Sequence, residues 1–287
     1  MFFLRQVDAG VSSGRQRNIC PFPRADENKD EKRNESTVQI ASSACAALQP
    51  PLEQNMHWIS EVIHTMTATT RDMTSGISIS GLTVPDSELA REATELVRDI
   101  ESPLLFNHST RVYYFGSLAG KRQGLKFDPE LLYIAAMFHD MGLTPSYSSK
   151  SDRFEVDGAN SARAFLHQRN ISQQEIDTVW TAIALHTTPG IPQHMHPVVA
   201  LLTNGVEMDV LGIAYPEFSA ADREAIVAAY PRTQNFKEDI IQAFYDGIRH
   251  KPETTFGNVK ADVLADKDPK FQRMNFCSII RGSQWKS

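Results

Sequence analysis

Four residues of this sequence combine metal-binding side chains with positions on or beside the apolar face of a predicted helix: His108, His139, Asp140 and Asp209. A helix of a globular protein turns its apolar face toward the core, so these groups are expected to meet inside the protein. Buried imidazole and carboxylate groups need partners, and one divalent metal ion can pair with both. The sequence therefore predicts a metal site built from these four side chains.

The adjacent pair His139-Asp140 is the sharpest element of this pattern. It lies at the predicted C-terminal end of a helix, just before Gly142, which is expected to end that helix. Neighbours on a regular helix diverge by about 100 degrees, but at a helix end the aspartate can turn back toward an ion that its neighbour binds. A lone histidine on an apolar face is more often a hydrogen-bonded core residue, so the metal hypothesis depends on the whole group.

Four further residues are candidates for catalysis. His186 ends an apolar helical stripe before a Pro-Gly loop, where it could orient a substrate, move a proton or cap the helix. Glu155 and Asp157 precede the position Gly158, where a helix is expected to start, so they are either capping carboxylates or partners of a ligand histidine or a substrate amine. Thr203 could offer its hydroxyl to a small substrate, although helical threonines often bond their own backbone.

The elements that position these residues are predicted to be helices. Helical spacing of apolar residues, with start and stop signals, predicts helices over residues 86–102, 128–140, 157–168 and 172–186, and others that start near Pro103, Pro197, Ser219 and Asn235. Ser172 and Glu175 form a capping box. No segment reads as alternating strands. We expect a flexible leader over residues 1–55 and an all-α catalytic domain over residues 56–287, whose bundle reaches about residue 250 and continues as a C-terminal extension.

Composition excludes several classes of protein. The 287 residues carry 29 Lys and Arg against 35 Asp and Glu, a formal charge of −6, which gives no broad basic surface for nucleic acid. No apolar run is long enough for a membrane span, and the N-terminus lacks a secretory signal. The three cysteines have no CxxC spacing, so we expect neither a disulfide framework nor a cysteine zinc site, and a reducing, cytoplasmic location.

The residues around the predicted site resemble the HD-domain superfamily of metal-dependent hydrolases, whose pattern is a histidine, then His-Asp, then a late aspartate. His108 stands here in NHSTR, His139 and Asp140 stand in FHDMGLT, and Asp209 follows. More specifically, the strings SPLLFNHSTRVYYFG, MFHDMGLT, RFEVDGANSARAFL, ALHTTPGI and KPETTFGNV resemble the fungal cyanamide hydratase (urea hydro-lyase) family, over roughly residues 82–285.

This resemblance implies an HD-type helical bundle that hydrates cyanamide, or a similar small nitrile, to urea with a metal-activated water. It implies one Zn²⁺ per chain, with Fe or Mn as other options, bound by the four residues named first. His186, with Glu155, Asp157 or Thr203, would then serve the substrate, and the resemblance also leaves open that His186 binds the metal as a fifth ligand. The expected partner is a small molecule rather than nucleic acid or a membrane, and a homo-oligomer is compatible with the sequence.

Three other functions remain open at this point. An HD phosphohydrolase would use basic side chains to bind phosphate, for which Arg111, Arg153 and Arg163 are near the motifs. A di-iron HD oxygenase would need about six ligands, so His186 and either Asp157 or His167 would have to join the four. A metal-stabilised regulatory domain would need no catalysis at all.

Overall fold

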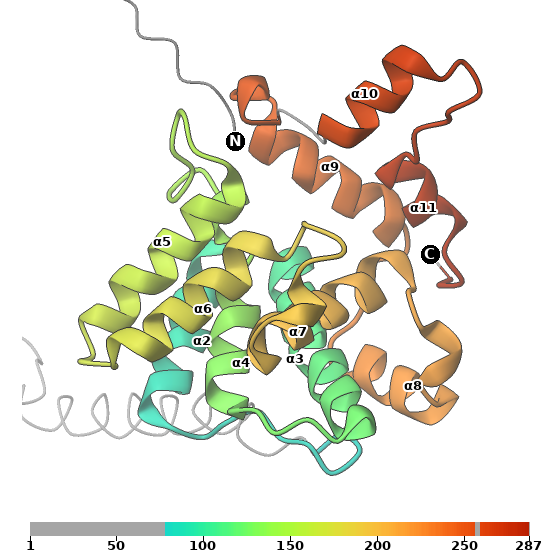
Figure 1. Ribbon diagram of the computed structural model, residues 1–287. Helices are drawn as coiled ribbons and strands as arrows, with labels where there is room; N and C mark the ends of the chain where they lie inside the picture. Colours follow the sequence, from blue (N-terminus) through green and yellow to red (C-terminus); the bar gives the residue numbers. More distant parts are fainter. Residues whose placement is uncertain (1–77, 256–258, 287) are drawn as a thin grey trace, which may run out of the picture. The chain divides into compact units, whose positions relative to one another are not determined.

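The chain is all-helical in the computed structural model, which describes residues 78–255 and 259–286. Within these residues the only β pairing is one isolated bridge between Ile79 and Leu82. Ten α-helices follow one another along the described chain (Figure 1): α2 Glu88–Ile100, α3 Pro103–Gln123, α4 Pro129–Phe138, α5 Phe154–His167, α6 Gln173–Leu185, α7 Pro197–Val206, α8 Ala220–Ala229, α9 Phe236–Ile248, α10 Val259–Lys267 and α11 Phe276–Gly282. The predicted all-α class is confirmed, and the predicted leader lies outside the described residues.

Short helical turns link some of these helices: η1 Met141–Leu143, η2 Pro192–His194, η3 Glu207–Leu211, η4 Tyr215–Glu217 and η5 Pro252–Thr255. All are 3₁₀ turns except η3, which is a wider π-helical turn that continues directly from α7.

Side chains at the helix starts act as the sequence signals predict. The Ser102 hydroxyl accepts from Leu105 N, and Pro103 is the first residue of α3. The Asp128 carboxylate caps α4, and Ser172 with Glu175 forms the predicted capping box of α6. Each cap satisfies backbone N–H groups that have no partner inside the helix, which fixes where the helix begins.

Two helix boundaries differ from the prediction. Helix α5 begins at Phe154, not near Gly158, because the buried Phe154 side chain extends the apolar face by one turn; Glu155 and Asp157 therefore lie inside the first turn. Gly142 does not end α4, because the chain passes into η1 there. A Cβ at Gly142 would lie 2.0 Å from Phe154 O, so this glycine permits close contact between η1 and α5.

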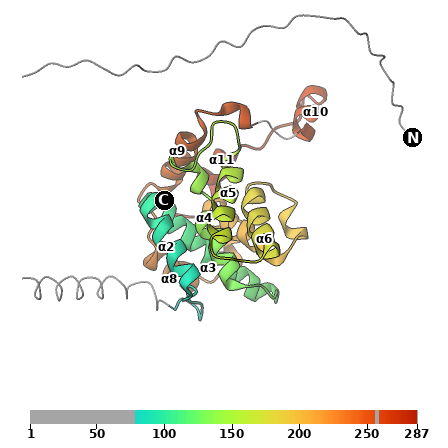
Figure 2. The ribbon, with the colours of Figure 1, turned by 90° about the vertical axis from the view of Figure 1, so that its left-hand side faces the viewer.

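The core lies among α3, α4, α6 and α7, whose buried apolar residues form one cluster. Helices α2 and α6 lie on opposite sides of α4 (Figure 2). Helices α3 and α7 touch backbone to backbone, since a Cβ at Gly205 would lie 2.2 Å from Val112 O. This close contact fixes the middle of α3 against the end of α7.

The predicted C-terminal extension contains α10 and α11. The Trp285 indole donates to Met208 O at 2.7 Å, so the end of the extension is held against η3. A second apolar cluster joins Ile280 of α11 and Phe236 and Ile240 of α9 to Phe154 of α5. Helix α10 contributes no buried residue. None of the helices in the described ranges is long and apolar enough to cross a membrane.

Candidate metal centre

Three histidines and one aspartate converge in the core. His108 lies in the second turn of α3, His139 is the C-cap of α4 with Asp140 after it, and His186 is the C-cap of α6. All four residues are buried, with at most 2% of any of them exposed. Helix ends therefore position this group, as the sequence predicts for His139, Asp140 and His186.

His108, His139 and Asp140 each offer one ligand atom within 4.8 Å of the others. The two Nε2 atoms of His108 and His139 are 3.2 Å apart. Asp140 Oδ2 lies 3.3 Å from His139 Nε2 and 3.6 Å from His108 Nε2. On the other side of Asp140, Oδ1 lies 3.8 Å from His186 Nε2. Three potential ligands thus lie close together, and His186 lies beside the third of them, Asp140.

The hydrogen bonds at Nδ1 determine which nitrogen of each histidine is free. His139 Nδ1 is 2.7 Å from Ala136 O and His186 Nδ1 is 2.6 Å from Ile183 O. A carbonyl oxygen only accepts, so both rings donate from Nδ1. His108 Nδ1 is 2.7 Å from the Asp209 carboxylate, which also only accepts when ionised. In its neutral form, each of the three rings would therefore turn an Nε2 lone pair toward Asp140.

Bare lone pairs that face one another need a cation between them. Two Nε2 lone pairs 3.2 Å apart repel each other unless a proton or a metal ion lies between them. Among the described residues, His186 Nε2 and both carboxylate oxygens of Asp140 are buried without a hydrogen-bond partner. Imidazole nitrogen with carboxylate oxygen is a common donor set for a divalent metal ion, and this arrangement fits one.

Asp209 is placed differently from the other predicted ligands. Its carboxylate binds His108 on the side away from the converging Nε2 atoms. Arg111 donates to both oxygens of Asp209, from Nε and Nη2, each at 2.8 Å. Arg232 Nη1 donates to Asp209 Oδ1 at 3.1 Å. The structure therefore brings Asp209 to His108, but with its oxygens already engaged by two arginines.

The π-helical turn η3 sets the position of Asp209. This turn ends at Gly212, whose φ of 68° is left-handed and suits glycine. Arg232 Nη1 also donates to the main-chain oxygen of Asp209 at 2.7 Å. The wide turn and this contact hold the carboxylate behind the His108 ring.

Mutual electrostatics keep the carboxylates ionised. Burial alone would raise the pKa of Asp140, but His139, His108 and His186 outweigh burial and hold that pKa below its usual range. The pKa of Asp209 is also low, because Arg111, Arg232 and His108 outweigh burial.

The histidines respond to burial in different ways. Burial lowers the pKa of His186 to about 4, and the neighbouring His139 adds to the effect. Burial would also lower the pKa of His139, but Asp140 and the Ala136 carbonyl raise it. At neutral pH His186 is therefore uncharged, so its Nε2 has a lone pair available for a metal.

The other predicted catalytic residues lie around this group. The Glu155 carboxylate accepts from Arg153 Nη2 at 2.5 Å and from the Thr187 hydroxyl, next to His186. Asp157 Oδ2 accepts from Lys251 Nζ at 2.6 Å, a fully buried lysine. The Thr203 hydroxyl is buried and has no partner among the residues described, and no contact links it to the histidines. Only Glu155 is thus directly joined to the surroundings of His186.

Sequence reasoning missed Arg232 and Lys251, and it considered Arg111 only as a phosphate ligand rather than as a partner of Asp209. Arg111 lies three residues after His108 on the same buried face, so its helical spacing could have identified it as a partner of the site. Arg232 and Lys251 come from loops far along the chain, and no local pattern connects them to Asp209 or Asp157.

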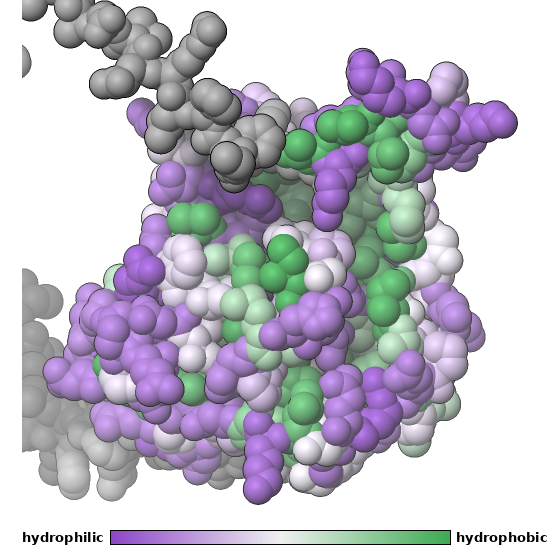
Figure 3. Space-filling view, viewed as in Figure 1, coloured by the Kyte–Doolittle hydropathy of each residue, from purple (hydrophilic) through white to green (hydrophobic). Residues whose placement is uncertain are grey.

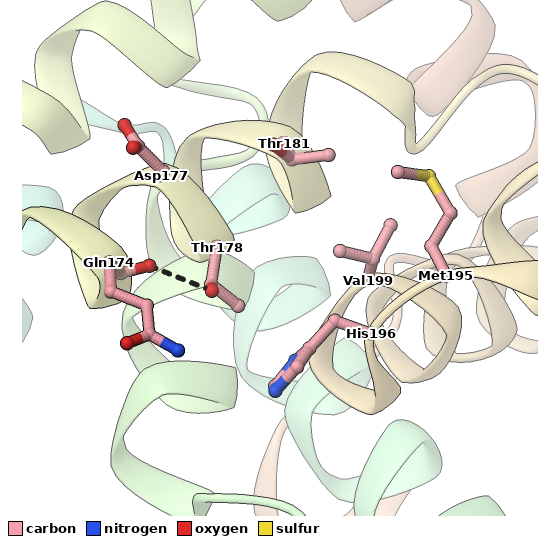
Figure 4. Close-up of a pocket in the computed structure, with 7 residues that line it drawn as sticks. All are labelled: Gln174, Asp177, Thr178, Thr181, Met195, His196 and Val199. Atoms are coloured by element: carbon pink, nitrogen blue, oxygen red, sulfur yellow. Dashed lines mark hydrogen bonds between the residues drawn. The ribbon is translucent and has the colours of Figure 1, made fainter.

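A surface pocket of about 470 Å³ lies between α6 and the start of α7 (Figure 4). Asp177, Thr178 and Thr181 line one wall, and Met195 and His196 line the other. None of the converging residues lines this pocket, and its side chains show no ligand-like convergence. The buried group, rather than the open pocket, is therefore the candidate site.

Comparison with known families agrees with this geometry. Residues 105–228 match the family model described as HD domain. The matched segment runs from α3 into α8 and contains His108, His139, Asp140, His186 and Asp209. No curated protein matches the chain. The match shows that this segment of the chain is similar to HD domains.

Proposed function

We propose that this protein hydrates cyanamide, or a similar small nitrile, with water activated by one divalent metal ion. The HD match supports the metal-dependent class, and the resemblance of the motif strings to cyanamide hydratases supports the substrate. The observation that carries the proposal is the convergence of three Nε2 lone pairs on Asp140, whose oxygens have no hydrogen-bond partner among the described residues.

His108, His139, Asp140 and His186 are the residues that would hold the ion. Asp209 supports His108 from behind rather than adding a further ligand. Nitrogen and oxygen donors of this kind accept zinc, iron and manganese, and zinc is the ion that the family resemblance implies. When bound, such an ion supplies Lewis-acid activation of water at neutral pH.

The reaction adds one water across the C≡N bond of cyanamide. The oxygen forms a bond to the nitrile carbon, the nitrogen gains protons, and the product N₂H₄CO is urea with no atom lost. If it is not bound to the ion, the buried His186 Nε2, which has no hydrogen-bond partner among the described residues, can pass a proton from water to the nitrile nitrogen. Glu155 holds Thr187 beside His186 and fixes the end of α6. Thr203, the other predicted substrate residue, has a buried hydroxyl without a hydrogen-bond partner among the described residues, but no contact joins it to this group.

The contacts of the arginines argue against a phosphohydrolase. Arg111 is bound to Asp209, Arg153 is bound to Glu155, and Arg163 donates to Asn160 and stacks over Trp180. None of the three is turned toward the converging donors, so the site has no obvious phosphate clamp.

The contacts of Asp157 and His167, the additional ligands that a di-iron site would need, argue against a di-iron oxygenase. Asp157 is paired with Lys251, and His167 is exposed at the end of α5. Neither reaches the buried group, which leaves too few ligands for two irons. The remaining alternative is a regulatory domain that a metal stabilises and that has no catalytic activity. The urea assay distinguishes this alternative from an enzyme.

The test couples metal analysis to a urea assay on one preparation. We expect about one zinc per chain and release of urea from cyanamide. His139→Ala and Asp140→Ala should lose both metal and turnover, whereas His167→Ala, which removes an exposed histidine, should lose neither. Metal-replete protein that forms no urea would exclude the named reaction, and two irons per chain would favour the oxygenase.

A further inference from the structure

The candidate site is closed on all sides by side chains. His108, His139 and Asp140 are fully buried, and His186 is 2% exposed. A substrate must therefore pass between covering residues. Helix α9 forms part of this cover, because the ring of its first residue, Phe236, lies 6.4 Å from the His108 ring.

A series of aromatic rings leads from His186 toward the surface. Phe154 lies 5.6 Å from His186, Phe244 of α9 lies 5.6 Å from Phe154, and Phe276 of α11 lies 5.7 Å from Phe244, all edge to face. Exposure increases along the series: Phe154 is 7% exposed, Phe244 is half-buried and Phe276 is 44% exposed. Figure 3 shows hydrophobic surface in a hollow beside the C-terminal helices.

Helix α9 is held at both ends, so it is a fixed cover. At its start Phe236 is fully buried. Near its end a Cβ at Gly247 would lie 2.9 Å from Leu143 Cα, so α9 touches η1. Just after the helix, Lys251 forms the buried ion pair with Asp157. Movement of the whole helix would break these contacts, whereas rotation of the half-buried Phe244 ring would not.

We propose that Phe154 and Phe244 form a filter at the substrate entrance and that Phe244 sets the size limit of the substrate. This inference rests on the proposed function. Aromatic rings offer an entering molecule no strong hydrogen bond, so an ion would lose its hydration without compensation. The filter therefore admits small uncharged molecules, such as cyanamide, and rejects nitriles with bulky substituents.

A second route to His186 is closed by polar groups. Arg153, whose side chain is 48% exposed, and Thr187 both bind Glu155 beside the histidine. If the substrate entered there, Arg153 rather than Phe244 would control its entry. Substituting each residue in turn and measuring the effect on substrate selectivity therefore distinguishes the two routes.

The kinetic test compares full-length variants on cyanamide, dimethylcyanamide and benzylcyanamide. In Phe244→Ala the ratio of kcat/KM for benzylcyanamide to that for cyanamide should rise about tenfold or more. The control Tyr245→Ala removes a neighbouring ring of α9 that is 55% exposed, and should leave the ratio unchanged. An unchanged ratio in Phe244→Ala, or a larger rise in Arg153→Ala, would overturn the inference. Phe244→Leu, checked by circular dichroism, replaces the alanine variant if that variant does not fold.

A binding test needs no turnover. We would load the protein with Co²⁺ and follow its visible spectrum as imidazole or 1-benzylimidazole is added. Phe244→Ala should speed the binding of 1-benzylimidazole about tenfold relative to imidazole. Equal rates in the variant and the parent protein would refute the filter even if urea is formed. A chain that binds no metal would refute the proposed function, and the filter with it, whereas size selection without urea formation would leave the filter standing and exclude only the reaction.

Discussion

His108 Nδ1 donates to Asp209 Oδ2 across 2.7 Å, on the opposite side of the ring from the atoms that converge on Asp140. This hydrogen bond fixes both the tautomer and the orientation of His108. A carboxylate behind a ligand histidine also makes the free nitrogen a better donor to a metal. The pattern His, His-Asp, Asp thus contains two kinds of aspartate, of which only Asp140 faces the converging nitrogens.

Asp209→Asn should weaken metal binding without abolishing it. Loss of the charge behind His108 is expected to lower zinc affinity about 10- to 100-fold. His139→Ala should remove tight binding altogether. Competition with a chromophoric chelator measures both affinities. If Asp209→Asn loses zinc as completely as His139→Ala, then Asp209 is a direct ligand, as the sequence pattern alone suggests.

Lys251→Met should strongly destabilise the protein. It would leave Asp157 buried without its cation, which is expected to cost about 3–5 kcal/mol of the free energy of unfolding. Replacement of both members, Lys251→Met with Asp157→Leu, should recover most of that loss. Urea denaturation measures the cycle, with Lys267→Met as a control on an exposed pair. Equal stability of the single and double variants would show that the pair is not coupled.

Gly205→Ala should be destabilising because the new Cβ would lie 2.2 Å from Val112 O. The contact is with backbone, so α3 and α7 would have to separate, at a cost of about 1–3 kcal/mol or more. Gly282→Ala offers a matched control, since a Cβ there meets nothing within 4 Å. Thermal unfolding should show a lower Tm for the first variant only. An unchanged Tm for Gly205→Ala would mean that the two helices adjust freely.

Glu101→Gln should stabilise the metal-free protein at alkaline pH and leave it little changed in acid. Burial, then the nearby charge of Asp140, raises the pKa of Glu101 well above 4.5. In the unfolded chain this carboxyl loses its proton near pH 4.5, while in the folded chain it retains the proton to higher pH. The free energy of unfolding therefore falls as pH rises through that interval.

Glutamine imitates the protonated carboxyl at every pH. The Tm difference between variant and parent should accordingly be near zero at about pH 4 and positive at about pH 8. A difference that is the same at both pH values would show that Glu101 is not held protonated in the fold.

The starts of several helices could be predicted from the sequence, because the capping residues that fix them act on neighbouring backbone groups. Caps at Ser102, Asp128 and Ser172 act through neighbouring backbone groups, so the sequence around them identifies each helix start. Apolar spacing places the start of α5 too late, because the burial of Phe154 depends on α9, which is distant in the sequence. Gly142 has the spacing of a helix stop, but its close contact with Phe154 O is equally non-local.

The same distinction applies to the site. His108, His139, Asp140 and His186 lie on or just after the inward faces of helices, so the helical period predicts their burial, but the contact among them depends on how α3, α4 and α6 pack. The partners that hold Asp209 and Asp157 come from distant loops, and charge alone did not identify them. The ion pair between Lys251 and Asp157 forms because the residue just after α9 lies against the first turn of α5. No local sequence pattern predicts that contact.

The π-helical turn at Glu207–Leu211 makes the site sensitive to chain length as well as to side-chain identity. A π turn contains one residue more than an α turn, so it is a place where the chain carries a single-residue insertion. Deletion of Met208, the residue before Asp209, would let the helix close to regular geometry and rotate Asp209 by about 100 degrees relative to α7. A chain that lacks this one residue would therefore need a different group behind His108.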